Sequence, residues 1–171
     1  TRPKIETRQQ VKPRPIKQVL NVKPNITSKD YLSILAKEIE KALPSAQVQI
    51  VQDSLKVLFP DNILYGNSAV LPITDINTEI SKFAKLIIKY DKTNVLVTGH
   101  TDAYGDAIGN KSLSELRAQY IKELLLAYRT PKERVNSWGL GSSSPISSSR
   151  TEAANRKNRR VEFVVLYNPK N

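Results

Sequence analysis

The chain of 171 residues contains no cysteine, no methionine, a single histidine, and only 6% aromatic residues. The absence of cysteine excludes disulfides, thiolate catalysis and Cys-ligated zinc. With one histidine a histidine-rich metal site is excluded too, so we expect neither a metal nor a cofactor. No apolar run approaches the ~20 residues of a membrane-spanning helix, and we expect none. Because the chain has no methionine, we expect Thr1 to be a trimmed start or a product of processing, and any targeting segment or lipid anchor either was removed or never existed.

What the sequence has in excess is positive charge, and this charge is concentrated in two segments. The net charge is +11. Residues 1–24 carry seven basic and one acidic side chain, and residues 150–160 carry five and one. Residues 25–149 carry 14 basic and 13 acidic side chains, and residues 161–171 balance. The total alone would favour a binder of nucleic acid or acidic surfaces. Binding of nucleic acid or acidic surfaces through the basic arm therefore stays as the alternative function. The rest of the chain is nearly neutral, however, so we expect no nucleic-acid partner.

The first 24 residues contain four prolines and little apolar periodicity. This composition predicts an extended arm. The arm is either a solvated linker or a strap that orders against a partner, such as another envelope protein.

Apolar periodicity predicts the elements of the remaining chain. We expect helices at 28–43, 74–90 and 112–128, a helical turn at 151–158, strands at 48–50, 55–59, 94–99, 134–138 and 160–166, and loops at 60–72 and 139–149. The strand at 94–99 has the β-branched, apolar composition of a central strand. The order predicts an α+β fold, an α/β sandwich in which a mixed sheet carries its helices on one face.

Capping residues and apolar stripes predict where two of these helices begin and which face they bury. Thr27 with Asp30 resembles a capping box for the first helix, which Pro44 ends. Ser112 with Glu115 predicts a capping box for the third helix. The apolar stripe of that helix is expected to comprise Leu113, Leu116, Tyr120, Ile121, Leu124 and Leu125, and Arg117 would border it.

Three clusters place polar residues where a purely structural sequence would not need them. The first is Gly-His-Thr-Asp at 99–102, at the end of the strand where ligands commonly meet loops. The second is Leu-Ser-Glu-Leu-Arg-Ala at 113–118, preceded by Asn110. The third is Asn-Arg-Lys-Asn-Arg-Arg-Val-Glu-Phe at 155–163, which enters the last strand.

In this order and spacing, together with Gly-Leu-Gly at 139–141 and Pro145, these clusters resemble the OmpA-like C-terminal peptidoglycan-binding domain family. The resemblance runs from about Val57 to Leu166. It divides the chain into a basic arm at 1–24, a helix and strand extension at 25–56, and the OmpA-like domain at 57–171. It implies a mixed βαβαβ-β sheet with helices on one face.

The resemblance also implies a function and a site. Members of the family bind peptidoglycan non-covalently, through the diaminopimelate of its stem peptide, whose free end carries an ammonium and a carboxylate on one carbon. Asp102 would accept from the ammonium, and Arg117 would bind the carboxylate with two hydrogen bonds. The other implied site residues are Thr101 and Asn110, which line the cleft, His100 of the same motif, and the pair Arg159 and Arg160. Arg160 is expected to face the cleft, although the strand phase could favour Arg159.

Other readings of the same residues are weaker. Asp102 and Arg117 could form only a structural ion pair, but the surrounding motif favours binding. His100 has neither a nucleophilic serine motif nor a second histidine to support hydrolysis, so we expect no enzyme. The resemblance implies a periplasmic protein associated with the outer membrane that anchors this membrane, or an envelope machine, to the cell wall. Pal-type lipoproteins and the OmpA-like lipoproteins of secretion systems are two such settings.

Overall fold

The computed structural model describes residues 26–60 and 76–171. The arm at 1–24 and most of the loop expected at 60–72 lie outside the described residues. The helices are α1 (Ser28–Ala42), α3 (Ile76–Lys89), α4 (Ala107–Ala127), the 3-10 turn η1 (Lys132–Arg134) and α5 (Glu152–Asn158). The strands are β1 (Gln47–Val51), β2 (Ser54–Pro60), β3 (Thr93–His100), β4 (Val135–Gly139) and β5 (Arg160–Tyr167). None of the helices described is long and apolar enough to cross a membrane.

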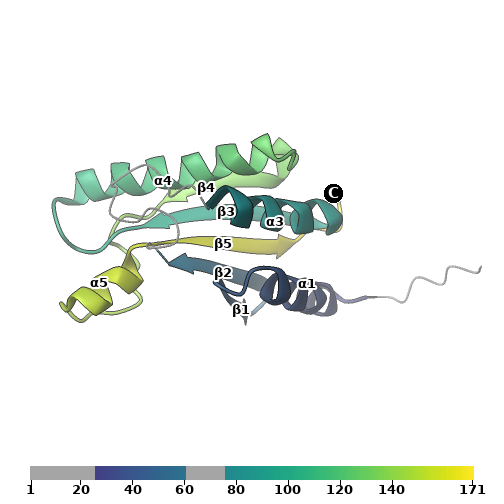
Figure 1. Ribbon diagram of the computed structural model, residues 1–171, viewed down its shortest axis with the longest axis horizontal. Coiled ribbons are helices and arrows are strands. Elements are labelled where there is room, and N and C mark those ends of the chain that lie inside the picture. The colour runs from purple at the N-terminus through teal and green to yellow at the C-terminus, as the bar shows by residue number, and fades with distance from the viewer. Residues whose placement is uncertain (1–25, 61–75) are drawn as a thin grey trace, which may run out of the picture.

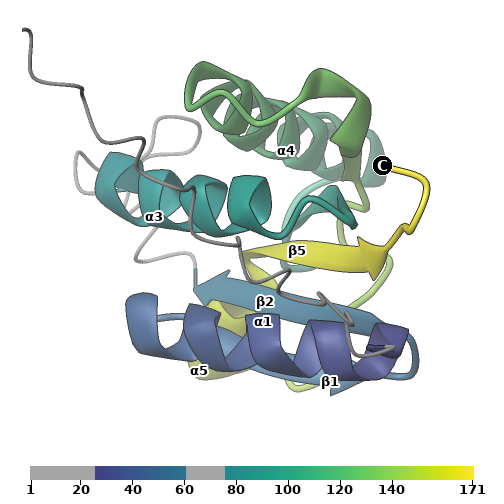
Figure 2. The same cartoon turned by 90° about the vertical axis from the view of Figure 1, so that its right-hand side faces the viewer.

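The strands form one mixed sheet in the order β1-β2-β5-β3-β4. Only β3 and β4 run parallel, and the other neighbouring strands are antiparallel. β3 is therefore an inner strand as expected, but the middle position belongs to β5. The helices α1, α3 and α4 lie side by side on one face of the sheet (Figure 2), while the short α5 lies beyond the end of the sheet where β5 begins (Figure 1). The predicted α+β class with helices on one face is confirmed.

A single apolar core lies between this helix layer and the sheet. Because side chains alternate along a strand, every second residue of β5, from Val161 to Val165, points into the core. Phe163 packs at its centre against Phe59 and Phe83, with ring centroids 5.4 and 4.6 Å apart. The buried side chains of α1 belong to the same core. The expected extension at 25–56 and the OmpA-like domain thus share one core in the described structure.

Helix α1 begins where its capping residue predicts. Thr27 is its N-cap, and the Asp30 amide donates to the Thr27 hydroxyl over 3.1 Å. That hydroxyl in turn donates to the Asp30 carboxylate over 2.7 Å. The N-cap predicted at Thr27 is confirmed, and Asp30 is its partner, but the Asp30 carboxylate accepts from the Thr27 hydroxyl, whereas a capping box would use the Thr27 backbone amide.

The start predicted for α4 is wrong. The helix begins at Ala107, and the N-cap is Asp106, whose carboxylate accepts from the Gly109 amide over 2.8 Å. Ser112 lies inside the helix and is exposed. Ile108 in the first turn of α4 is 81% exposed, so this turn adds no buried apolar residue to the stripe from which the helix start was predicted.

The buried face of α4 also differs from the predicted stripe. Ile121 and Leu125 of the predicted stripe are buried, but Leu116 and Tyr120 are exposed. The other buried residues of α4 are Asn110, Ser114, Arg117 and Ala118. The reason is a close approach between α4 and the ends of β3 and β4. A Cβ on Gly99 would collide with the Ser114 carbonyl, and one on Gly139 with the Glu115 backbone. Small and polar residues therefore replace large apolar ones at this point of the helix.

Candidate functional site

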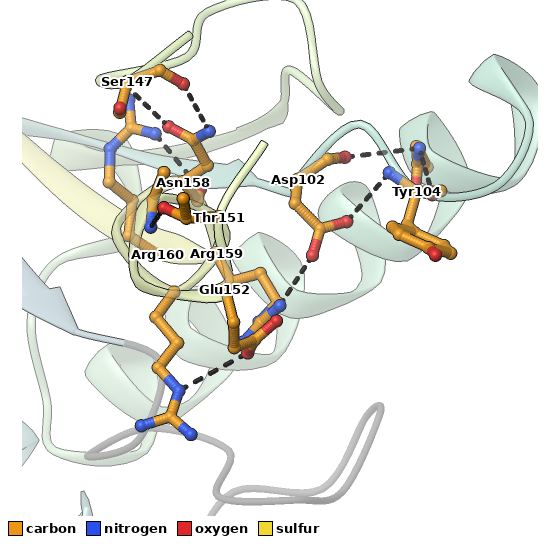
Figure 3. Close-up of polar contacts among 11 residues, drawn as sticks. Asp102, Tyr104, Ser147, Thr151, Glu152, Asn158, Arg159 and Arg160 are labelled. Atoms are coloured by element: carbon orange, nitrogen blue, oxygen red, sulfur yellow. Dashed lines mark hydrogen bonds and ion pairs between the residues drawn. The ribbon is translucent and has the colours of Figure 1, made fainter. Parts of the chain in front are cut away.

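The candidate site is built around Asp102, the second residue after β3. Asp102 is 9% exposed, and its carboxylate has two partners. Oδ1 accepts from the Tyr104 amide over 3.0 Å, which closes a tight Asx turn. Oδ2 accepts from Nη1 of Arg159 over 2.6 Å (Figure 3). The turn and the ion pair together fix the orientation of the carboxylate.

Arg159 lies between two carboxylates. Its Nη2 donates to Glu152 over 2.6 Å, and Arg156 contacts the same Glu152 oxygen. Burial lowers the pKa of Arg159, but the hydrogen bonds that it donates to Glu152 and Asp102 outweigh burial, and the net shift of its pKa is upward. The hydrogen bond from Arg159 in turn lowers the pKa of Glu152. The arginine is therefore a permanent cation beside Asp102.

Asn110, on the first turns of α4, supports the loop that carries Asp102. Its side-chain amide donates to the Tyr104 carbonyl over 2.9 Å and to the Asp102 carbonyl over 3.4 Å. Arg117 lies on the same face of α4 two turns further along, and it is 5% exposed. Expected as a border residue of the stripe, it is instead part of the buried face.

Thr101 is also buried, at 4% exposure. Its amide donates to the Gly141 carbonyl over 2.9 Å, which ties the loop after β3 to the loop after β4. Its hydroxyl Oγ1 is buried without a hydrogen-bond partner among the described residues. Thr101 also lines a cleft next to this loop.

The structure places Arg160 away from Asp102, which corrects the expectation that Arg160 faces the cleft. Adjacent residues at the start of a strand point in opposite directions, so Arg159 reaches Asp102 while Arg160 faces the sheet surface opposite the helices. Arg160 is 5% exposed there and forms an ion pair with Glu162 at 2.7 Å. It also donates to the carbonyl of Ser144 over 3.1 Å. These contacts with the described residues hold the start of β5 and the Ser144 backbone, which is a structural role.

His100 belongs to this same buried group. Its Nε2 lies 3.2 Å from the Thr98 hydroxyl and 3.8 Å from Glu162, and its Nδ1 is buried without a partner among the described residues. Burial, helped by the neighbouring Arg160, lowers the pKa of His100 to about 4. The ring is therefore neutral at neutral pH, and it contacts Thr98 and Glu162.

Asn158 is a residue whose role the sequence did not indicate. Its side-chain Oδ1 accepts from the amides of Ile146 and Ser147 over 2.8 and 3.0 Å, and its Nδ2 donates to the Ser147 carbonyl over 2.8 Å. This buried amide thus holds the Ser-rich loop 142–150 against α5 (Figure 3). The only signal for it was its place in the motif at 155–163.

A cleft of about 460 Å³ lies between the loop after β3 and the Ser-rich loop. Thr101 and Tyr104, which flank Asp102 in the sequence, line one side, and Ser147, Arg150 and Asn155 line the other. Among the described residues, no group of three or more His, Cys, Asp or Glu side chains is arranged to hold a metal ion. The chemistry that the site offers is hydrogen bonding and ion pairing.

Comparison with known proteins gives a consistent result. The model of the OmpA family matches residues 65–159, more than half of the chain. The outer-membrane lipoprotein YfiB of Pseudomonas aeruginosa is 33% identical over 103 residues, which cover 60% of this chain and 61% of YfiB. The peptidoglycan-binding protein ArfA of Mycobacterium bovis is 30% identical over 115 residues, which cover 67% of this chain and 35% of ArfA.

Among solved structures, the cell wall anchor of the T6SS from Pseudomonas aeruginosa superposes with a TM-score of 0.66. The match has 23% identity and covers 83% of this chain and 98% of the anchor. At that identity it shows a shared fold. The chain spans less than two thirds of the length of YfiB and of ArfA.

Proposed function

We propose that this chain, which belongs to the OmpA family, binds peptidoglycan non-covalently and anchors the outer membrane or an envelope-spanning machine to the cell wall. The names of its relatives support this role, since they include a peptidoglycan-binding protein, an outer-membrane lipoprotein and a cell wall anchor. The protein then works in the periplasm, in association with the outer membrane.

The observation that carries the proposal is that the Asp102 carboxylate is held in a fixed orientation beside an arginine. A carboxylate offers about four acceptor directions, and the described residues take two of those of Asp102. The remaining directions suit the ammonium of diaminopimelate. The carboxylate on the same carbon requires a guanidinium nearby, and Arg117 and Arg159 are the two candidates. Arg159 is held at Asp102 by the structure, and Arg117 is implied by the family motif.

Asn110 and Thr101 act in this proposal through the loop rather than by charge. Asn110 holds the two carbonyls that flank the Asp102 turn, and Thr101 joins the loop to Gly141. Pre-organisation of this kind reduces the ordering cost of binding. Arg160 and His100 contribute by supporting the start of β5 and the end of β3.

We propose binding without catalysis. His100 is 2% exposed and lies against Thr98 and Glu162, so it does not serve as a base for a ligand at Asp102. Incubation with peptidoglycan should release muropeptides only at the background rate. Residues 1–24 are proposed as a strap for other envelope proteins, residues 25–56 as the extension and residues 57–171 as the OmpA-like domain. A lipid anchor preceding the chain is part of the same proposal.

The test is co-sedimentation of the full chain with purified peptidoglycan sacculi. Asp102→Asn keeps the shape and removes the charge, and should weaken binding about tenfold or more, the usual effect of losing a charge-assisted contact. Asp53→Asn, which changes an exposed carboxylate in the β1–β2 turn, is the control and should bind as wild type. Free diaminopimelate should compete with wild-type binding.

Both variants keep the basic arm, so attraction of the arm to an anionic polymer is the same in all samples. A purely structural ion pair at Asp102 predicts a lower melting temperature with unchanged affinity of the folded fraction. Equal affinity of folded Asp102→Asn and wild type would therefore refute the proposed site.

A further inference from the structure

Trp138 is the only tryptophan of the chain and its side chain is 60% exposed. It lies on β4, which is an edge strand, beside α4. The Lys111 ammonium lies 5.1 Å from the centre of the indole ring, and Lys111 also contacts Glu115 and the Gly139 carbonyl. The ring is thus held at the surface by a cation–π contact instead of being buried in the core.

Three concavities that share lining residues form a track from Trp138 to the cleft that Thr101 and Ala103, the sequence neighbours of Asp102, line. The first, of about 250 Å³, is lined by Trp138, Ser137, Gly139, Glu115 and Gln119. The second, of about 290 Å³, lies over the start of α4 and includes Lys111, Gly139 and Ser142. The third is the 460 Å³ cleft, which also includes Ser142. Gly139 joins the first to the second, and Ser142 joins the second to the third.

From this continuous track we propose that Trp138 is a stacking platform for the glycan strand of peptidoglycan, a binding subsite separate from Asp102. The inference rests on the proposed function. A β-linked pyranose presents a flat face of C–H bonds, which packs on an indole ring, and a rim of hydroxyl and acetamido groups, which needs hydrogen-bond partners. Glu115, Gln119 and Ser137 line the same concavity and supply such partners.

The continuity of the track argues for this occupant. A stem peptide bound at Asp102 is covalently attached to a glycan strand, so its sugar units are delivered to the neighbouring surface. An additional contact on the same polymer raises the overall affinity because the second binding event is intramolecular. The linings also fit a sugar, because they combine one large aromatic ring with hydroxyl, amide and charged groups and contain few other apolar side chains.

The single tryptophan makes the test direct. The intrinsic fluorescence of the wild-type chain should change in a saturable manner on titration with N-acetylglucosamine hexamer, since a sugar over the ring removes water from it. Peptide-free glycan strands should give the same response. Asp102→Asn should keep this response while losing affinity for sacculi, which separates the two subsites.

Trp138→Ala should bind the hexamer about tenfold more weakly by calorimetry, the usual loss for an aromatic anchor. Leu166→Ala removes an exposed apolar side chain from β5 and should bind as wild type. The inference is overturned if the glycans cause no saturable fluorescence change. It is equally overturned if Trp138→Ala binds sacculi weakly while peptide-free glycans do not bind the wild type, because Trp138 would then contact the peptide. Failure of the Asp102→Asn test with a persistent glycan response would instead count against the proposed function.

Discussion

His100 should make the stability of this protein fall between about pH 6.5 and pH 4. Burial lowers its pKa in the folded chain to about 4, from an unfolded value near 6.5. Well above pH 6.5 the His100 ring is neutral in both the folded and the unfolded chain, so its titration does not change the free energy of unfolding. Below pH 6.5 the unfolded chain takes up a proton that the folded chain does not, and unfolding is favoured.

The magnitude follows from the two pKa values. At pH 5 protonation of His100 in the unfolded chain lowers the free energy of unfolding by about 2 kcal/mol. Below pH 4 this loss reaches its full value of about 3 kcal/mol. The charged groups that face the ring are Arg160, Glu162 and Lys56. Arg160 and Lys56 lower the pKa of the imidazole and Glu162 raises it, but burial is the largest cause, so the direction holds.

The assay is urea denaturation of wild type and His100→Gln, followed by far-ultraviolet circular dichroism between about pH 7.5 and pH 4. Glutamine is polar, similar in size and does not titrate. The difference in free energy of unfolding between the two proteins should shift by about 2 kcal/mol towards the variant as the pH falls from 7.5 to 5. Carboxylates common to both cancel in this difference. Parallel pH profiles would show that His100 titrates normally and would refute the reasoning.

Two further predictions concern the frame of the site. Gly99→Ala should lower the free energy of unfolding by about 2–3 kcal/mol, because its Cβ would collide with the Ser114 backbone carbonyl. Gly109→Ala in the first turn of α4 is the comparison: its Cβ would meet the carboxylate of Asp106, an exposed side chain that can shift, so its cost should be smaller. Equal melting temperatures for the two variants would contradict the close approach. Asn158→Ala removes three hydrogen bonds and should lower the free energy of unfolding by about 3 kcal/mol. Hydrogen exchange of the Ile146 and Ser147 amides should become faster. Asn158→Asp keeps the two acceptor bonds and should keep those amides protected.

The periodic segments of the fold were predictable from sequence because their burial is one-sided. Alternation marked β2 and β5, and the i, i+3/i+4 stripe marked α1 and α3. The same reasoning failed for α4, where the sheet is so close at Gly99 and Gly139 that Ser114 replaces a large apolar residue. A stripe drawn through leucines then selected the exposed Leu116. Apolar periodicity locates a helix, but its orientation also depends on how closely its neighbours approach.

The candidate site residues were proposed from a motif, whereas their contacts could be seen only in the structure. Asp102 and Asn110 lie together as the motif implied. The buried Arg134 was read only as the start of a strand, but its guanidinium donates to the carbonyls of Ile87, Tyr90 and Thr93 and so caps the end of α3. No local pattern indicates such a role, because the partners are more than 40 residues away in the sequence.

Arg159 and Arg160 show why the net charge of a segment overstates the positive charge that a ligand meets. The segment 150–160 has a net charge of +4, which suggested a cationic rim. Yet Arg160 neutralises Glu162 within the protein, and Arg156 and Arg159 share Glu152. Among the arginines of this segment, only Arg150 lines the large cleft. Ligand affinity should therefore depend less steeply on salt than the sequence charge implies, and recognition should rest on the placed pair of Asp102 and an arginine, which a uniformly cationic surface could not provide.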